Sequence, residues 1–170
     1  MSTIREMFER FTDVNADMVS IVNDIATELT PKIVEYNKKQ LAEGKTSEDK
    51  KIGDKSPYFK TDYFPNHEAH RINKGLRVDL IDLKWSGKLY DSLFPEFDFT
   101  KYKILSNDNP SKVNALMYGG TGGDRTCGCL SVREGGFGEE IFGLTQTNAT
   151  EIQKSGNNLL VKEIKIRTKL

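Results

Sequence analysis

The stretch Trp85-Ser86-Gly87-Lys88-Leu89-Tyr90-Asp91-Ser92-Leu93 decides how we expect the middle of the chain to fold. Ser86 is a good N-cap, because its hydroxyl can accept a hydrogen bond from an unpaired amide of a first helical turn. Trp85 before this cap and Tyr90 after it have the spacing of a hydrophobic staple. The stretch therefore predicts the start of a short helix.

This short helix carries no chemically reactive side chain. Leu89 and Leu93 are four residues apart and would share one face, and Pro95 would end the helix. We expect the helix to serve docking and not catalysis, with Trp85, Leu89 and Tyr90 as candidate interface residues.

The first third of the chain predicts a long helix. Apolar residues recur at three- and four-residue spacing from Ile4 to Leu41. Thr30-Pro31 predicts a kink or a restart of the helix, and Gly44 predicts its C-terminal cap. An apolar stripe of this length is typical of a core or of a helix–helix interface.

The region after this helix has two parts of different composition. Residues 45–55 are mostly charged, Ser or Gly, which predicts a solvated loop. Residues 56–75 carry aromatic side chains without a steady period, which indicates an extended arm that lies against another surface. The candidate interface residues of this arm are Tyr58, Phe59, Tyr63 and Phe64.

The second half of the chain predicts an antiparallel sheet. Residues 97–102 and 102–105 alternate as strands do, and 113–118 would complete a hairpin after the turn formers at 107–110. A third strand is expected near 130–132. The glycine-rich segment around Gly122 and Gly123 predicts a flexible loop at an assembly contact.

The last segment of the chain fits two structures. Ile164, Ile166, Thr168 and Leu170 alternate with basic residues as in a strand, whereas Leu159, Leu160, Glu163 and Ile164 fit a helix face. Its basic residues are Lys162, Lys165, Arg167 and Lys169. A solvated helix face explains them most simply, and contact with packaged nucleic acid is the alternative.

Composition excludes several classes of protein. A chain of 170 residues suits one domain, and its 25 basic and 25 acidic residues leave no overall charge to attract nucleic acid or an anionic membrane. The first residues lack a signal-peptide pattern, and no apolar run approaches the roughly 18 residues of a membrane-spanning helix. We expect a soluble protein, made in a cytoplasm, without a membrane partner.

The histidines and cysteines suggest a zinc site only weakly. His67, His70, Cys127 and Cys129 are the only residues of their types, and two imidazoles with two thiolates could complete a tetrahedral shell. However, the gaps within the two pairs are shorter than those of standard zinc sites. A zinc-stabilised binding module is therefore the alternative function, and we expect no cofactor and no catalytic residue.

Three segments resemble one family in their order along the chain. Residues 85–93, the earlier Lys38-Lys39-Gln40-Leu41-Ala42-Glu43-Gly44-Lys45 and the later Phe137-Gly138-Glu139-Glu140-Ile141-Phe142-Gly143-Leu144-Thr145 resemble motifs of the neck or tail-completion proteins of tailed bacteriophages that infect gut bacteria. Together they cover the span from residue 38 to about 152. Ser86 stands where the family usually has Thr, and Cys127-Gly128-Cys129 has no counterpart there.

The resemblance implies a structural virion protein without catalysis, made in the host cytoplasm and located in the neck or tail. Such a protein forms a head–tail connector ring of roughly six or twelve copies between the portal and the tail. Its partners would be its own copies, the portal or neighbouring neck and tail proteins, and DNA in the channel. The N-terminal helical stripe, the aromatic arm and Phe142 would then contact neighbours.

The predicted fold class is α+β, in a single domain of residues 1–170. Residues 1–44 would be helical, 45–82 a loop and arm, 83–144 a short helix with antiparallel strands, and 145–170 a C-terminal helix. The resemblance favours helix over strand for the last of these segments. The N-terminal helices and the C-terminal helix would pack on a small antiparallel sheet.

Overall fold

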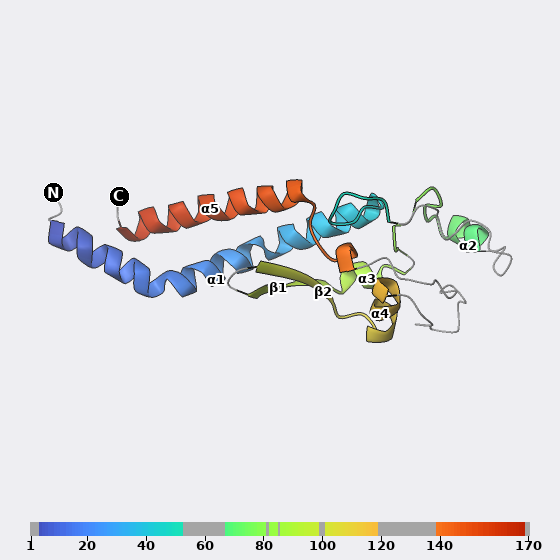
Figure 1. Cartoon of the computed structure of the whole chain (residues 1–170), viewed down its shortest axis with the longest axis horizontal. Coiled ribbons are helices and arrows are strands. Elements are labelled where there is room, and N and C mark those ends of the chain that lie inside the picture. The colour runs from blue at the N-terminus through green and yellow to red at the C-terminus, as the bar shows by residue number, and fades with distance from the viewer. Residues whose placement is uncertain are drawn as a thin grey trace.

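A computed structural model describes residues 4–52, 67–80, 82–84, 86–98, 101–118 and 139–168 of the chain. It has the predicted α+β architecture: a long N-terminal helix and a C-terminal helix with a small antiparallel sheet (Figure 1). Helix α1 spans Ile4–Ala42, and helix α5 spans Gln146–Thr168. The two helices run antiparallel side by side, and the sheet lies on another side of α1.

Helix α1 continues through Pro31 without a restart. The Thr30 hydroxyl donates to the carbonyl of Ala26 at 3.0 Å and so bonds back along the same helix. Of the two possibilities predicted for Thr30-Pro31, a kink or a restart, the restart was therefore wrong. The Thr30 hydroxyl bonds to a carbonyl of the preceding turn, and it therefore does not cap the start of a new helix.

Gly44 ends α1 as predicted. Its φ of 69° is in the left-handed region, its N–H donates to the Leu41 carbonyl at 2.9 Å, and the Lys45 N–H donates to the Gln40 carbonyl at 3.0 Å. These two bonds form a Schellman motif. Because a left-handed residue without a Cβ is needed there, glycine fixes the end of the helix.

The loop after α1 is more ordered than a solvated loop. Lys45 and Lys51 form an antiparallel bridge, and the Ile52 N–H donates to the Gly44 carbonyl at 2.7 Å. The side chain of Ile52 is buried in the core. The loop folds back because this one apolar side chain gains more from burial than from exposure.

The sheet is a single hairpin of two six-residue strands. Strand β1 spans Leu93–Asp98 and strand β2 spans Lys101–Ser106, paired antiparallel with Pro95 opposite Ile104. Pro95 is therefore within a strand, and its predicted role as a helix stop was wrong. The side chains of Phe97 and Tyr102, which are paired in the register, stack with their centroids 4.8 Å apart.

The short helix before β1 is smaller than predicted. Helix α3 spans Lys88–Asp91, and its N-cap is Gly87 at a φ of 85°, with no side-chain cap bond. Ser86 Oγ lies one position too early and accepts only a long bond of 3.4 Å from the Lys88 N–H. The predictions of a Ser86 cap and of Leu93 within the helix were thus wrong.

Residues 113–118 form a helix and not the predicted strand. Helix α4 spans Pro110–Tyr118, and Asn109 Oδ1 accepts a bond from the Ser111 N–H at 2.9 Å. Asparagine as N-cap followed by proline in the first turn is a strong helix start, and it overrides the alternation of the sequence. The third strand expected near 130–132 lies outside the described residues.

The core is one cluster to which most of these elements contribute. The remaining elements are helix α2, His67–Asn73, and a 3₁₀ turn η1, Glu139–Ile141. The buried residues of the cluster are Leu29, Ile33, Leu41, Ile52, Leu89, Leu93, Ile104, Leu116, Ile141 and Ile152. Helices α1 and α5 extend from this cluster beyond the end of the hairpin, and both chain termini lie at that end (Figure 1).

Candidate assembly interface

The three segments that resemble the phage family meet at one place. Leu41 from the first segment, Leu89 and Leu93 from the second and Ile141 from the third belong to the same core cluster. These segments are distant in sequence, and their apolar residues are buried together. The motif residues at these four positions therefore contribute to the core.

Two amide side chains on α1 hold the turn that leads into α5. Asn37 Nδ2 donates to the carbonyls of Ile141 at 3.2 Å and Gly143 at 2.7 Å. Gln40 Nε2 donates to the Gly143 carbonyl at 3.1 Å, and its Oε1 accepts from the Thr145 N–H at 2.9 Å. We call Asn37 and Gln40 the amide clamp. It satisfies backbone groups that would otherwise be desolvated without partners.

Gly143 is required at this turn for steric reasons. A Cβ built on Gly143 would lie 2.8 Å from the Cβ of Ser47, and the Ser47 N–H is held by the Glu140 carbonyl at 2.8 Å. The backbone of Ser47 therefore has little freedom to withdraw. Glycine allows the loop after α1 and the turn before α5 to approach closely.

We expect Gly143→Ala to lower the free energy of unfolding by about 1–3 kcal/mol through this overlap. Urea unfolding followed by circular dichroism measures the loss. Ser47→Gly removes the colliding Cβ, so the double variant Ser47→Gly/Gly143→Ala should recover part of it relative to Ser47→Gly. A Gly143→Ala protein as stable as the parent would show that the turn is looser than described.

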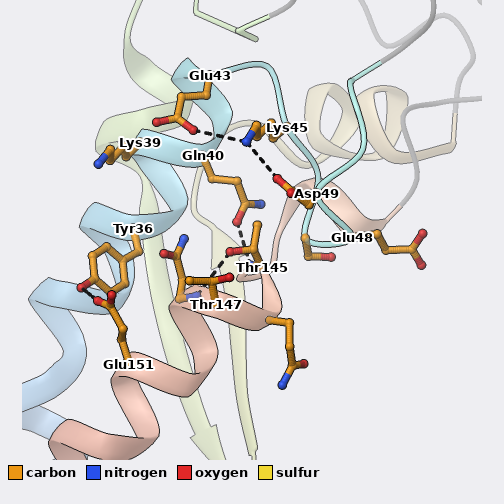
Figure 2. Close-up of a pocket in the computed structure, with 13 residues that line it drawn as sticks. Tyr36, Lys39, Gln40, Glu43, Lys45, Glu48, Asp49, Thr145, Thr147 and Glu151 are labelled. Carbon is orange, nitrogen blue, oxygen red and sulfur yellow. Dashed lines mark hydrogen bonds and ion pairs between the residues drawn. The ribbon is translucent and has the colours of Figure 1, made fainter.

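A polar hollow of about 550 Å³ lies beside the amide clamp (Figure 2). It is enclosed by the end of α1, the loop after it and the start of α5. Its lining residues are Tyr36, Lys39, Gln40, Glu43, Lys45, Ser47, Glu48, Asp49, Thr145, Gln146, Thr147, Asn148 and Glu151.

Several charged side chains of this hollow are paired with one another. Lys45 Nζ lies 3.0 Å from Asp49 Oδ1, and this hydrogen bond raises the pKa of the lysine. The Tyr36 hydroxyl donates to the Glu151 carboxylate, which raises the pKa of the phenol. Both shifts stabilise the protonated form of a group that is already protonated at neutral pH. They activate neither a base nor a nucleophile.

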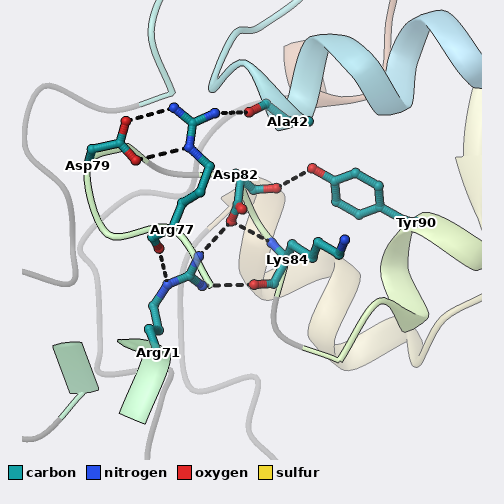
Figure 3. Close-up of polar contacts among 7 residues, drawn as sticks. All are labelled: Ala42, Arg71, Arg77, Asp79, Asp82, Lys84 and Tyr90. Atoms are coloured by element: carbon teal, nitrogen blue, oxygen red, sulfur yellow. Dashed lines mark hydrogen bonds and ion pairs between the residues drawn. The ribbon is translucent and has the colours of Figure 1, made fainter. Parts of the chain in front are cut away.

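A buried ion pair organises the segment between α2 and α3 (Figure 3). Arg71 Nη2 lies 2.9 Å from Asp82 Oδ1, and both side chains are almost fully buried. Arg71 also donates to the carbonyls of Arg77 at 2.6 Å and Lys84 at 2.8 Å. Asp82 Oδ1 accepts in addition from the Lys84 N–H at 3.0 Å. This network is structural, since its groups are bonded to one another and closed to solvent.

An exposed apolar stripe runs along the first half of α1. Ile4, Phe8, Phe11 and Val19 recur at helical spacing, and their exposed fractions are 88%, 71%, 46% and 53%. The side of α1 that packs on α5 is a different one and contains Val14 and Ile21, which are buried. We call these four exposed residues the α1 stripe.

The α1 stripe continues a face that is buried farther along the helix. Ala26 and Ile33 lie on the same helical face, and both are buried. Ile33 belongs to the core cluster together with Leu93 and Ile104 of the hairpin. The six-residue strands of the hairpin extend only over the second half of α1, so no element among the described residues covers the first half of this face.

A small apolar hollow marks the point where the cover ends. It has a volume of about 340 Å³ and lies between α1, α5 and the end of the hairpin. Its walls include Val22, Ile25, Phe97, Tyr102 and Ile152. The α1 stripe and this hollow form one apolar surface of a kind that marks interaction sites.

The structure places the predicted interface residues in different environments. Leu89 is buried in the core of its own chain and is not accessible to a partner. Tyr90 is half-buried and donates its hydroxyl to the Asp82 carbonyl, and half-buried Phe142 packs against the core cluster. The predicted residues that lie outside the described part of the chain are Trp85, Tyr58, Phe59, Tyr63, Phe64, Gly122 and Gly123.

The structure does not describe the side chains of the proposed zinc ligands. His67 and His70 are residues of helix α2, and Cys127 and Cys129 lie outside the described part of the chain. Over the described ranges, no three His, Cys, Asp or Glu side chains are grouped so that they could hold a metal ion. No helix in the same ranges is both long and apolar enough to cross a bilayer.

Periodicity indicated an interface on α1 but did not locate it. It identified the apolar recurrence from Ile4 onward, but not which part of that stripe stays uncovered. Gln40 lies in the first of the three segments singled out in the sequence, but nothing in the sequence indicated that Asn37 and Gln40 bond the turn before α5, because Asn and Gln residues occur throughout exposed helices. Comparison of the chain with known protein families, with curated proteins and with solved structures gave no match.

Proposed function

We propose that this protein is a structural virion protein, a subunit of the head–tail connector or neck ring between the portal and the tail of a tailed bacteriophage. The observation that carries the proposal is the α1 stripe, an apolar face that is uncovered over the first half of a long helix. A contiguous exposed apolar surface of this kind marks an interaction site. Copies of the same chain in a ring would cover it.

The resemblance supports the same function from another direction. Its three segments are distant in sequence, yet four of their residues build one core cluster, as expected if the motifs specify a common fold. The charges of the polar hollow and of the Arg71 network are paired structurally, which leaves interfaces as the main chemistry of the described surface. The further partners under this proposal are the portal, other neck or tail proteins and DNA in the channel.

The mass of the native assembly tests this function directly. We expect the 19.2 kDa chain to form rings of roughly six or twelve copies at high concentration or on purified portal. Native mass spectrometry and negative-stain microscopy would detect them. A protein that stays monomeric under both conditions would contradict the proposal.

The variant Phe8→Asn/Phe11→Asn should weaken this assembly. Removing two partly exposed phenyl rings from an apolar contact costs about 2 kcal/mol per interface, or roughly thirtyfold in association. Sedimentation velocity over a concentration series measures the shift. Ile72→Asn is the matched control, because Ile72 is 57% exposed but lies on α2, away from the stripe. Equal assembly of the double variant and the control would remove the α1 stripe from the interface.

A further inference from the structure

Helix α5 has an exposed basic face on the side away from α1. Lys154, Asn158, Val161 and Lys165 follow one another at helical spacing, and all four are exposed. The opposite side of α5 packs on α1, where Gly156 approaches Leu29. Over residues 154–168 there are four cationic side chains and a single carboxylate, Glu163.

Helix α1 has the opposite charge over its first half. Residues 4–22 contain four carboxylates and only two guanidinium groups, those of Arg5 and Arg10. The carboxylates form one flank of the helix and are Glu6, Glu9, Asp13 and Asp17. The first and last charged residues of this flank and of the basic face of α5 are each eleven positions apart, or roughly 16 Å along the helix.

These two charged surfaces belong to one structural unit. Arg167 Nη1 lies 2.7 Å from Asp17 Oδ2, and Arg10 Nη1 donates to the Thr168 carbonyl at 3.2 Å. These contacts join the first half of α1 to the C-terminal end of α5, and we call residues 4–22 and 154–168 the two-helix arm (Figure 1). The arm is therefore acidic along α1 and basic along the outer face of α5.

We infer that the arms of neighbouring copies pack side by side and head to tail, with the basic outer face of α5 in one copy against the outer side of α1 in the next. This inference rests on the proposed ring. Val161 would contact Phe8 of the α1 stripe, while Lys154 and Lys165 would face the acidic flank beside Glu9 and Asp13. Because the two surfaces differ, the contact is heterologous and repeats around a ring.

Lys154 and Lys165 are better suited to contact a second copy of the chain than to bind nucleic acid. Val161 lies among them and is 50% exposed, and an exposed valine gains nothing beside a phosphate backbone. The chain as a whole carries equal numbers of acidic and basic residues, so no general field draws nucleic acid to it. A neighbouring α1 supplies both the apolar contact and the opposite charge.

Charge reversal in the full-length chain tests the inference. Lys154→Glu/Lys165→Glu makes the outer face of α5 acidic, and Glu9→Lys/Asp13→Lys makes the flank of α1 basic. We expect either double variant to associate roughly ten- to hundredfold more weakly than the parent, because attraction becomes repulsion in every contact. Raising the salt concentration should weaken the association of the parent and reduce the difference in association between the parent and the variants.

The quadruple variant, which combines both reversals, distinguishes this contact from others. In a heterologous contact its acidic α5 again faces a basic α1, so it should assemble with itself but not with the parent. The control Lys101→Glu/Lys103→Glu makes the same charge change on exposed residues of β2 and should leave assembly unchanged. Circular dichroism of each variant establishes that the helices are retained.

The possible outcomes separate this contact from the ring itself. If the parent forms rings and the charge reversals do not alter them, the proposed contact between neighbouring arms is wrong, but the proposed ring is still supported. If those reversals instead abolish retention of a DNA duplex, the lysines serve nucleic acid, which also overturns the inference. If the quadruple variant mixes freely with the parent, the contact is not heterologous. A parent that never assembles contradicts the proposed function first.

Discussion

Replacing Asp82 with alanine will destabilise the segment between α2 and α3 by about 3–5 kcal/mol. The substitution leaves the guanidinium of Arg71 almost fully buried without its carboxylate partner. The two carbonyls that Arg71 also contacts solvate its charge but cannot neutralise it. The segment should therefore open locally so that the guanidinium can reach water.

Hydrogen exchange measures this opening residue by residue. The amides of Gly75 and Leu76 donate to the carbonyls of Ile72 and Arg71 at 2.9 Å each, so their protection reports on the segment. We expect Asp82→Ala to lower that protection by at least about a hundredfold.

Asp79→Ala is the control for this prediction. It removes the carboxylate of the Arg77–Asp79 pair, which lies only a few residues away but is at least half exposed. Exposed pairs contribute about 0–1 kcal/mol, so protection should hardly change. Similar losses in the two variants would mean that burial does not govern the Arg71–Asp82 pair.

Replacing Gln40 with leucine will lower the free energy of unfolding by about 2–4 kcal/mol. The substitution keeps an apolar stem of similar size but removes the donor to the Gly143 carbonyl and the acceptor of the Thr145 N–H. Gln40 is only 2% exposed, so water does not replace the lost partners without opening the turn. Asn37 still holds Gly143, which limits the loss.

Lys39→Leu provides the comparison for Gln40→Leu. It introduces leucine at the neighbouring position of α1. The Lys39 side chain is exposed and is not part of the amide clamp. We expect it to change the stability by less than about 0.5 kcal/mol. Chemical denaturation of both variants gives the two values, and equal midpoints would show that Gln40 contributes nothing to the amide clamp.

The sequence predicts the ends of α1 and the class of the fold because both depend on local chemistry. Gly44 closes the helix wherever it occurs in such a context, since only a residue without a Cβ takes a φ of 69° at low cost. The same local chemistry explains the error at residues 113–118. Asn109 and Pro110 were interpreted as a turn between strands, although together they make a strong helix start.

Other features depend on residues that come together only in the folded chain. The burial of Leu89 follows from its place beside Leu41 and Ile141, which no spacing around residue 89 reveals. The exposed part of α1 is set by the length of the hairpin strands. Periodicity detects an apolar face, but it cannot tell which half another element covers.

The pairing of the two ends of the arm has a consequence for biosynthesis. Arg10 and Asp17 find their partners only at Thr168 and Arg167, about 150 residues later in the chain. During synthesis, the first turns of α1 can therefore pack against α5 only after almost the entire polypeptide has been made. Prematurely terminated products would lack α5, so these contacts of α1 would remain unmade.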